Sequence, residues 1–491
     1  MSKTYSGNDT LKKVLALIKN ELSGKVNYKD QLTEDDVRRI WNDITGEQLP
    51  NTGVLFHNHD DLYSKLDHTH DEKYYTKEDV LKILEDSINL ISSTETYGFR
   101  INQNESDPSS MISYISDSNN YRPARMNFDT GVFNYGDWNK AFFIKDIKVV
   151  MMNYDGSIAY EINKNDYTKK IDGTPSDISN ESYPGNVMVG IPKVYWKIIN
   201  NGDNTADVYI SNRKVDDDFH CWSHIDNDGN ELDYCYMAAY NGSLIDGKLR
   251  SISGKEPMRF TTRNQEVEYA LNNNQTADKL WYTGLYSDRI LIQLLLMLMS
   301  KSTNSRDVFG GGNNRTYVDP TNHGIMNSGS MNNKGLFWGS NDNTSGVKVF
   351  GIEHFWGNIW NSIAGWIMDK GVQKIKMTYG QSDGTTTDGY NFDGNGYKVI
   401  PNSLPEGGNG GFLNKVIFTE NGFIPKSAAG SDTTYFNVGF WFNNDIVSYA
   451  LVGGVSNHAS RVGSCYADLD SAVSFAYWNV GSSLSFKGKA S

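Results

Sequence analysis

The first 95 residues carry a helical pattern of apolar and polar positions. Mostly apolar residues recur in steps of four and three within residues 8–22 and again within residues 77–91, which is the spacing of a coiled-coil seam. The seam positions are Leu11, Leu15, Ile18 and Leu22 in the first segment, and Val80, Leu84, Ser87 and Ile91 in the second. Two or three heptads are marginal as a single helix. We therefore expect an oligomeric helical stalk; a small three-helix domain with its own core is the alternative.

Beyond residue 97 the helical pattern gives way to short runs of β-forming residues, separated by Gly, Asn and Asp turns. Strands are predicted over residues 148–152, 187–189, 194–199 and 208–210. This part of the chain therefore reads as short strands joined by much irregular backbone.

Helices are rare in this second part. Residues 288–301 predict one strong helix, and residues 265–272 predict another. Residues 302–345 are rich in Gly, Asn and Ser and predict a long ordered loop. The inner face of the strong helix would be formed by Ile292, Leu295, Leu296 and Met299.

Together these patterns predict an α+β fold class, with a short helical coiled-coil stalk followed by a head rich in loops and short strands. A chain of 491 residues exceeds one ordinary core. We expect a stalk over residues 1–95, a β-rich connector and the start of the head over residues 96–180, and the rest of the head over residues 181–491.

Two histidine pairs lie between the predicted stalk helices. The sequence repeats His-x-His-Asp-acidic-x-Tyr, with its histidines at His57, His59, His68 and His70. Both members of a pair face the same side of an extended strand, and imidazole is a common metal ligand. Three parallel chains would offer six nitrogens to a divalent transition metal, iron-like or zinc, and leave no open coordination position. Such an ion would be structural. A four-histidine zinc site within one chain and plain surface linker residues are the alternatives.

Charge and cysteine content narrow the function classes. The formal net charge is −13 and no basic stripe is present, so nucleic-acid binding is not expected. Three cysteines, Cys221, Cys235 and Cys465, make no disulfide framework and favour a reducing compartment, such as a bacterial cytoplasm, for folding. The longest apolar run, residues 290–299, is too short to span a bilayer, and no secretory signal is visible, so membrane insertion is not expected.

Several motifs resemble known families. Gly357-Asn358-Ile359-Trp360 is similar to the Gly-Asn-x-Trp motif of the C-type-lectin-like fold shared with formylglycine-generating enzymes. Val452-Gly453-Gly454, followed by Trp478-Asn479-Val480-Gly481, resembles the Gly-Gly … Trp-Asn-Ile-Gly frame of the variable proteins of diversity-generating retroelements. The N-terminal helix with its His-Asn-His-Asp-Asp-x-Tyr sequence is similar to phage tail-fibre stalks, which are typically homotrimers with an iron-like ion chelated on the three-fold axis.

These resemblances imply a phage or prophage tail-fibre adhesin, a receptor-binding protein with a C-type-lectin-like head and no enzymatic activity. Its partners would be a host cell-surface protein or glycan, two further copies of the chain in a homotrimer, and other tail or baseplate proteins. It would be located in the virion after folding in the bacterial host cytoplasm. Three weak head contacts would add through the shared stalk.

The candidate binding face is the segment of residues 455–477. It contains no Lys, Glu, Gln, Met or Trp, the five residue types that adenine-directed mutagenesis of Asn-type codons cannot reach. Small residues alternate there with chemically mixed ones, and exposed aromatic and Arg side chains suit a contact surface. An ordinary β-hairpin surface is the alternative. The predicted ligand-binding residues are Ser456, Asn457, His458, Arg461, Ser464, Tyr466, Asp468, Asp470, Phe475 and Tyr477.

An enzyme head of the formylglycine-generating or polysaccharide-depolymerase type is the alternative function. The first resembles chemistry at two nearby cysteines, whereas the C-terminal region holds only Cys465. For the second, the acidic residues of 216–218 and 226–228 could supply carboxylates, although a solvated turn explains them equally. A bacterial surface adhesin is a third reading. Calcium-dependent sugar binding is not expected, because Glu256-Pro257 is followed by Met258; calcium-free sugar binding stays open.

Overall fold

The computed structural model describes residues 94–276, 280–315 and 323–490. The chain divides into two units, Met1–Thr94 and Glu95–Ser491, and the described residues belong almost entirely to the second. The predicted coiled-coil segments and the four histidines His57, His59, His68 and His70 lie outside the described residues.

The described part of the chain is predominantly β, so the predicted α+β class is wrong. Strands account for 33% of it and helices for 11%, and the described α-helices number four, all short. No coiled-coil pair occurs within these ranges. The physical reason is the frequent Gly, Asn and Asp turns, which interrupt the chain before most segments reach helical length. The described helices are α4 (Phe142–Lys145), α5 (Arg263–Leu271), α6 (Tyr286–Ser300) and α7 (Ser305–Phe309), with single 3-10 turns at η1 (Trp138–Lys140), η2 (Trp222–His224) and η3 (Ala459–Arg461).

A six-stranded sheet joins distant parts of the chain. Its order is β13-β26-β10-β7-β5-β6, and all eight residues of β7 are buried. The predicted strands at residues 148–152 and 187–189 are confirmed as β5 and β7 of this sheet, and they lie on opposite sides of residue 180. Its strands are β5 (Lys148–Asn153), β6 (Ile158–Glu161), β7 (Gly185–Pro192), β10 (Tyr234–Ala238), β13 (Trp281–Thr283) and β26 (Leu484–Phe486).

A second, antiparallel sheet has four strands in the order β2-β1-β9-β8. The predicted strands at residues 194–199 and 208–210 are confirmed here as β8 and β9. Its strands are β1 (Thr96–Asn102), β2 (Ile112–Ser116), β8 (Tyr195–Asn200) and β9 (Thr205–Ser211); the separate hairpins are β3 (Arg125–Asn127) with β4 (Val132–Asn134), β11 (Ser243–Ile245) with β12 (Lys248–Arg250), β14 (Lys348–Val349) with β15 (Ile352–Glu353), and β20 (Lys415–Thr419) with β21 (Gly422–Ser427).

The C-terminal third builds the largest sheet, in the order β18-β17-β16-β23-β24-β22-β19, with β25 added beside β16. β24 pairs parallel with β22 and antiparallel with β23. Its strands are β16 (Trp360–Asp369), β17 (Val372–Ile375), β18 (Lys398–Val399), β19 (Gly410–Phe412), β22 (Gly439–Phe442), β23 (Val447–Val452), β24 (Ala467–Leu469) and β25 (Val480–Gly481).

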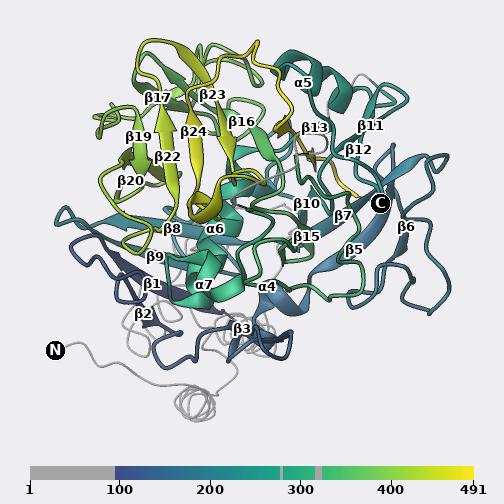
Figure 1. Cartoon of the computed structure of the whole chain (residues 1–491), viewed down its shortest axis with the longest axis horizontal. Helices are drawn as coiled ribbons and strands as arrows, with labels where there is room; N and C mark the ends of the chain where they lie inside the picture. The colour runs from purple at the N-terminus through teal and green to yellow at the C-terminus, as the bar shows by residue number, and fades with distance from the viewer. Residues whose placement is uncertain (1–93, 277–279, 316–322, 491) are drawn as a thin grey trace, which may run out of the picture. The chain divides into compact units, whose positions relative to one another are not determined.

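Helix α6 lies in the middle of these sheets (Figure 1), and all fifteen of its residues are buried. The strong helix predicted over residues 288–301 is therefore confirmed, but it is buried on every side, as expected of a helix that is apolar nearly all round. The predicted loop over residues 302–345 is wrong in one place, because α7 begins there at Ser305. Asn304 caps α7 by accepting hydrogen bonds from two backbone N–H groups.

The Gly-Asn-Ile-Trp motif fixes an irregular segment to the core. The buried side chain of Asn358 accepts hydrogen bonds from Asn313 Nδ2 at 2.9 Å and from the backbone of Met326 at 2.7 Å. Asn358 Nδ2 donates to the Met326 carbonyl at 3.1 Å. Asn358 also has a positive φ of 67°, which asparagine tolerates better than most residues. Both polar atoms of this buried amide thus bind Met326, and its oxygen also binds Asn313.

Candidate binding surface

The predicted binding segment falls into two parts with different surroundings. Residues 456–470, called the packed half below, contain η3 and β24 and lie against the largest sheet. Residues 471–478, called the open half, follow β24 as irregular backbone without a charged side chain. The yellow chain beyond β24 in Figure 1 follows this path toward α5.

Three of the predicted contact residues are buried in the packed half. Ser456 and Tyr466 are fully buried and Ser464 is 4% exposed, so the expectation that these side chains form an exposed face is wrong. The Tyr466 hydroxyl accepts a hydrogen bond from Trp441 Nε1 at 3.0 Å and lies 3.0 Å from His458 Nδ1. The Tyr466 ring is covered by Trp360, with the two ring centroids 4.6 Å apart, and by the closely approaching backbone of Gly439 and Gly454.

The polar residues of the packed half differ in their burial and in their pKa values. Burial, assisted by Arg461, lowers the pKa of His458 to about 4. Burial and the neighbouring Asp470 carboxylate raise the pKa of Asp468 well above its usual range, and Asp468 accepts a hydrogen bond from the backbone N–H of Asp470 at 2.9 Å. Asn457, Arg461 and Asp470 are exposed. The three exposed side chains are the part of this half that a ligand could reach.

The open half presents aromatic rings to solvent. Phe475 is 38% exposed and Tyr477 is 49% exposed, and their ring centroids lie 5.9 Å apart. Tyr477 is followed by the half-buried Trp478, whose ring stacks on His323 with centroids 4.0 Å apart. Phe475 and Tyr477 were both predicted as binding residues, and the structure brings them together.

A fifth aromatic residue comes from a distant part of the chain. Phe260 is 61% exposed, and its backbone N–H donates to the carbonyl of Tyr477 at 3.1 Å. Its φ of +58° lies in the left-handed region, which is an outlier for a bulky side chain and carries a conformational cost of about 1–3 kcal/mol. Phe260, His323, Phe475, Tyr477 and Trp478 together are called the aromatic surface.

The segment that carries Phe260 is fixed at both ends. Before it, the carbonyl of Met258 lies where a side chain at Gly481 would clash, at 2.4 Å, so only glycine permits this close approach. After it, the N–H of Arg263 donates to the Val473 carbonyl at 3.1 Å. Arg263 and Glu266 form a buried ion pair at 2.6 Å in the first turn of α5. Phe260 is thus held by the core rather than by a free loop.

Sequence reasoning missed Phe260 and His323. No local signal in the sequence indicates that Phe260 adopts a positive φ. A capping box, in which Thr262 and Gln265 exchange hydrogen bonds, begins α5 directly after it. That motif could have located the turn at Phe260, but it could not have indicated that the segment containing Tyr477 lies beside it.

An open hollow adjoins the aromatic surface. It is bounded on one side by the open half and on the other by α5 and by the loop of residues 376–397. Its lining residues are Thr262, Asn264, Phe392, Asp393, Val447, Ala472, Val473 and Ser474. The hollow therefore mixes apolar side chains with hydroxyl, amide and carboxylate groups.

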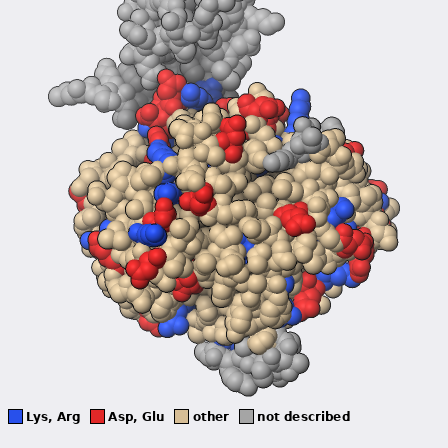
Figure 2. Space-filling view, turned by 90° about the horizontal axis from the view of Figure 1, so that it is seen from above, with Lys and Arg blue, Asp and Glu red and all other residues tan. Residues whose placement is uncertain are grey.

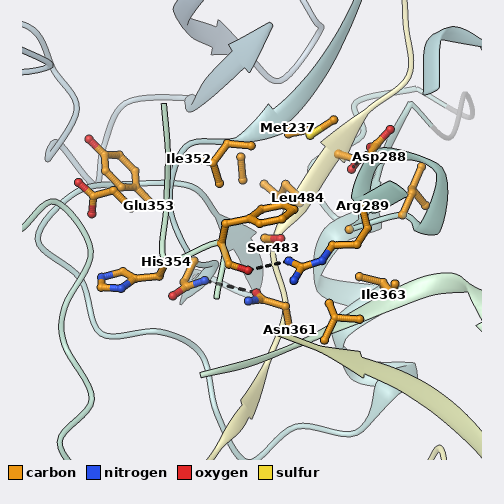
Figure 3. A pocket seen from close by; sticks show the side chains of 18 residues that line it. Met237, Asp288, Arg289, Ile352, Glu353, His354, Asn361, Ile363, Ser483 and Leu484 are labelled. Carbon is orange, nitrogen blue, oxygen red and sulfur yellow. Dashed lines mark hydrogen bonds between the residues drawn. The ribbon is translucent and has the colours of Figure 1, made fainter. Parts of the chain in front are cut away.

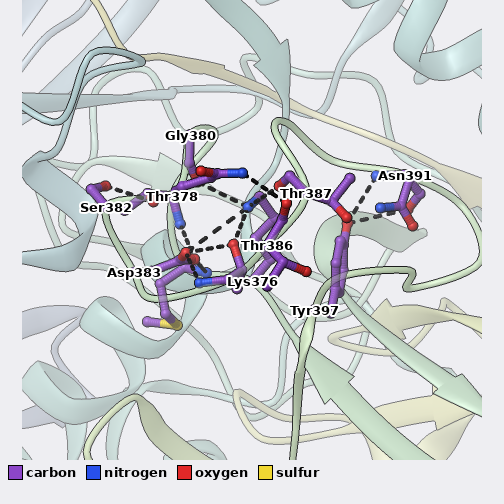
Figure 4. A network of polar contacts seen from close by, with 12 residues as sticks. Lys376, Thr378, Gly380, Ser382, Asp383, Thr386, Thr387, Asn391 and Tyr397 are labelled. Atoms are coloured by element: carbon purple, nitrogen blue, oxygen red, sulfur yellow. Dashed lines mark hydrogen bonds and ion pairs between the residues drawn. The ribbon is translucent and has the colours of Figure 1, made fainter.

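A buried lysine organises the loop that forms one wall of this hollow (Figure 4). Lys376 Nζ donates to the carbonyls of Gly380 at 2.9 Å and Thr387 at 2.7 Å, and also to the hydroxyl of Thr385. Asp383 lies 3.9 Å from this ammonium group and accepts hydrogen bonds from the backbone of Met377 and Thr378. Burial lowers the pKa of Lys376. Its ammonium group thus occupies a cage of oxygen atoms within the loop.

Charge is sparse around these elements. The side of the molecule that carries α5 faces the viewer in Figure 2, and its charged side chains lie singly or in small groups between wide uncharged areas. Near the aromatic surface, Arg259 is paired with Glu256 and its guanidinium lies 5.6 Å from the Phe260 ring centroid. A ligand of this surface would meet rings and neutral polar groups more than charges.

A second concave feature is an interior cavity beside α6 (Figure 3). Its volume is about 60 Å³, which is small beside the roughly 300–1,000 Å³ of ligand pockets. Arg289 reaches into it and donates to the carbonyls of Phe355 and Ser464, both at 2.6 Å. Burial lowers the pKa of Arg289 to about 9. The arrangement links α6 to the packed half and is an internal structural contact.

The cysteines and the aspartates of residues 216–218, which an enzyme could have used, lie in surroundings that do not activate them. All three cysteines are buried and free, and burial raises the thiol pKa to about 12 at Cys221 and about 11 at Cys465, the opposite of an activated thiol. Asp216 and Asp218 both lie within about 3 Å of Lys197 Nζ at the surface. These carboxylates act as ion-pair partners in a solvated turn.

The sequence matches no protein-family model, and no curated protein is significantly similar to it. Within the described ranges, no three His, Cys, Asp or Glu side chains gather in a way that could hold a metal ion. None of the described helices is long and apolar enough to cross a membrane.

Proposed function

We propose that this protein is a receptor-binding protein of the phage tail-fibre type, which attaches to a ligand on the bacterial surface through the aromatic surface without chemically altering it. The observation that carries the proposal is Phe260, an exposed ring held at a positive φ beside the exposed Tyr477. Exposed aromatic side chains on a fixed backbone are typical of binding hot spots. The assignment to tail fibres rests on the sequence motifs alone.

Rigidity supports a binding role for this surface. Four of its five residues come from the segments before α5 and after β24, and backbone hydrogen bonds tie those two segments together, while His323 comes from a third segment. A fixed surface loses little conformational entropy on binding, which increases the affinity available from a few rings. Of the predicted residues, Phe475 and Tyr477 would make the central contacts, while Asn457, Arg461 and Asp470 would contribute at the edge.

Avidity would complete the mechanism. In a homotrimer, three heads bind one cell, so the affinity of each can be modest. The residues that would hold a structural transition metal between the chains are His57, His59, His68 and His70, which offer two nitrogens per pair. Partners within the virion would be other tail or baseplate proteins.

The test is binding of the fluorescently labelled full chain to a panel of bacterial strains, followed by flow cytometry. We expect a subset of strains to bind it, and expect the double variant Phe475→Ser, Tyr477→Ser to bind those strains at least tenfold more weakly. The control is Val132→Ser, at an exposed apolar residue in β4, with unchanged binding. Absence of binding to every strain at micromolar concentration, or full binding by the double variant, would contradict the proposal.

A further inference from the structure

We infer that the ligand of the aromatic surface is a neutral saccharide, with Phe260 as the fixed ring on which a sugar stacks. This inference rests on the proposed attachment function and names its ligand class. The alternative occupant, a protein on the cell surface, is an outcome that the test below separates.

The size of the exposed apolar area favours a saccharide over a protein. Phe260, Phe475 and Tyr477 are exposed by 61%, 38% and 49%. With ~200 Å² for each aromatic residue, they present roughly 300 Å² together. A stable protein partner usually covers about 800 Å² on each side, of which roughly 450 Å² is apolar. An area of 300 Å² suits a few sugar rings, and binding by several heads compensates for modest affinity.

The polar groups beside the exposed rings also favour a saccharide. A pyranose has an apolar C–H face, which fits an aromatic ring, and a rim of hydroxyl groups, which need hydrogen-bond partners. The adjoining hollow offers the hydroxyl of Ser474, the amide of Asn264 and the carboxylate of Asp393. No Lys or Arg lines this hollow, and Asp393 would repel an anion. Arg259, which lies beside the Phe260 ring, is paired with Glu256. A neutral sugar is therefore favoured over an acidic one.

The conformation of Phe260 indicates a functional requirement for its ring. Gly or Asn would adopt a φ of +58° with less strain, and neither would leave a large apolar side chain exposed. A backbone outlier at an exposed position stabilises nothing by itself. The sequence retains phenylalanine in a place where stability alone favours another residue, which contact with a ligand would explain.

The ligand class is tested on strains that bind the full chain. Cells are treated with periodate, which cleaves the vicinal diols of sugars, or with a broad-specificity protease. We expect periodate to reduce binding at least tenfold and protease to leave it within twofold. Loss after protease with retention after periodate would overturn the saccharide inference while leaving attachment intact. If no strain binds before treatment, the proposed function itself fails.

The role of Phe260 is tested by Phe260→Asn, which removes the ring and suits the backbone conformation. The probe is a panel of immobilised neutral oligosaccharides of glucose, galactose, mannose and N-acetylglucosamine. We expect at least one to bind, with affinity at least tenfold lower in Phe260→Asn, retained in Phe260→Trp and unchanged in the control Val132→Asn. The melting temperature of Phe260→Asn should equal or exceed that of the wild type. Equal affinity of Phe260→Asn and wild type, or binding to no neutral sugar, would overturn the inference.

Discussion

The packed half and the open half of the C-terminal segment are adjacent in sequence, yet they use aromatic side chains in opposite ways. In the packed half, Tyr466 is fully buried and its hydroxyl is shared between Trp441 and His458. In the open half, Tyr477 is half exposed beside Phe475 and Phe260. The same residue type is thus a core residue at position 466 and a surface residue eleven positions later.

The difference comes from the elements packed over each half. In the packed half, Arg289 and Gln293 of α6 donate to the carbonyl of Ser464, and the Trp360 ring lies 4.6 Å from the Tyr466 ring between their centroids. The chain then leaves the sheet, and the carbonyls of Val473 and Tyr477 accept hydrogen bonds from the backbone of Arg263 and Phe260, at and just before the start of α5. Mixed composition alone therefore does not identify a contact surface; the elements packed over the segment decide which residues a ligand can reach.

The largest effect that separates the halves is expected from truncating their tyrosines. Tyr466→Ala should lower the free energy of unfolding by about 4 kcal/mol, because a large buried ring leaves a cavity. Tyr477→Ala should change it by less than about 0.5 kcal/mol, since its ring is half exposed, while weakening cell binding. Urea denaturation of both variants measures this. Similar stability losses in the two variants would contradict the division.

The second largest effect on stability is expected in the loop of residues 376–397, which bounds the hollow beside the open half. Lys376→Met should lower the free energy of unfolding by about 3 kcal/mol, because it leaves the nearly buried carboxylate of Asp383 without its cation. The control Lys398→Met, in a partly exposed ion pair with Glu420, should cost less than about 1 kcal/mol. Denaturant titration of both variants is the measurement. A loss at Lys376 no larger than at Lys398 would show that the oxygen cage contributes little.

The sequence predicted where several strands and α6 lie along the chain, but it did not predict which distant segments contact each other. Hydrophobic runs located β5, β7, β8, β9 and α6, because these elements are strongly apolar over several residues. The α+β class was wrong, because the prediction relied partly on the heptad patterns of residues 8–22 and 77–91, which lie outside the described residues. For the aromatic surface, composition found Phe475 and Tyr477. It could not find Phe260, because the two segments lie more than 200 residues apart and meet through backbone hydrogen bonds that any residue types could make.

A third effect is acid sensitivity in the packed half. The pKa of His458 is lowered to about 4, whereas an unfolded histidine titrates near 6.5. Between these values the unfolded state binds a proton that the folded state does not, so stability falls as the pH drops from about 6.5 to 4. His458→Gln should lose less stability over this interval than the wild type, by about 2 kcal/mol. The buried His224 and His354 have pKa values lowered to about 3 and about 4, and they leave a residual dependence in both proteins.

The pH dependence of His458→Gln is measured by denaturation at several pH values between 4 and 7. Identical slopes for the variant and the wild type would show that His458 has the same pKa in the folded and unfolded states and that the packed half is more open than its contacts indicate.

The smallest effect is expected at Asp468 and has the opposite sign. Its raised pKa means that the folded state keeps the carboxyl protonated while the unfolded state ionises above about pH 4, so stability is lost as the pH rises. Asp468→Asn removes this loss and should stabilise the protein by about 1 kcal/mol at pH 7, with little change at pH 3. Asp470→Asn should gain less, because burial, the larger cause, still acts on Asp468. Denaturation at both pH values measures the difference. Destabilisation of Asp468→Asn at pH 7 would mean that the folded packed half holds the ionised form of this carboxylate.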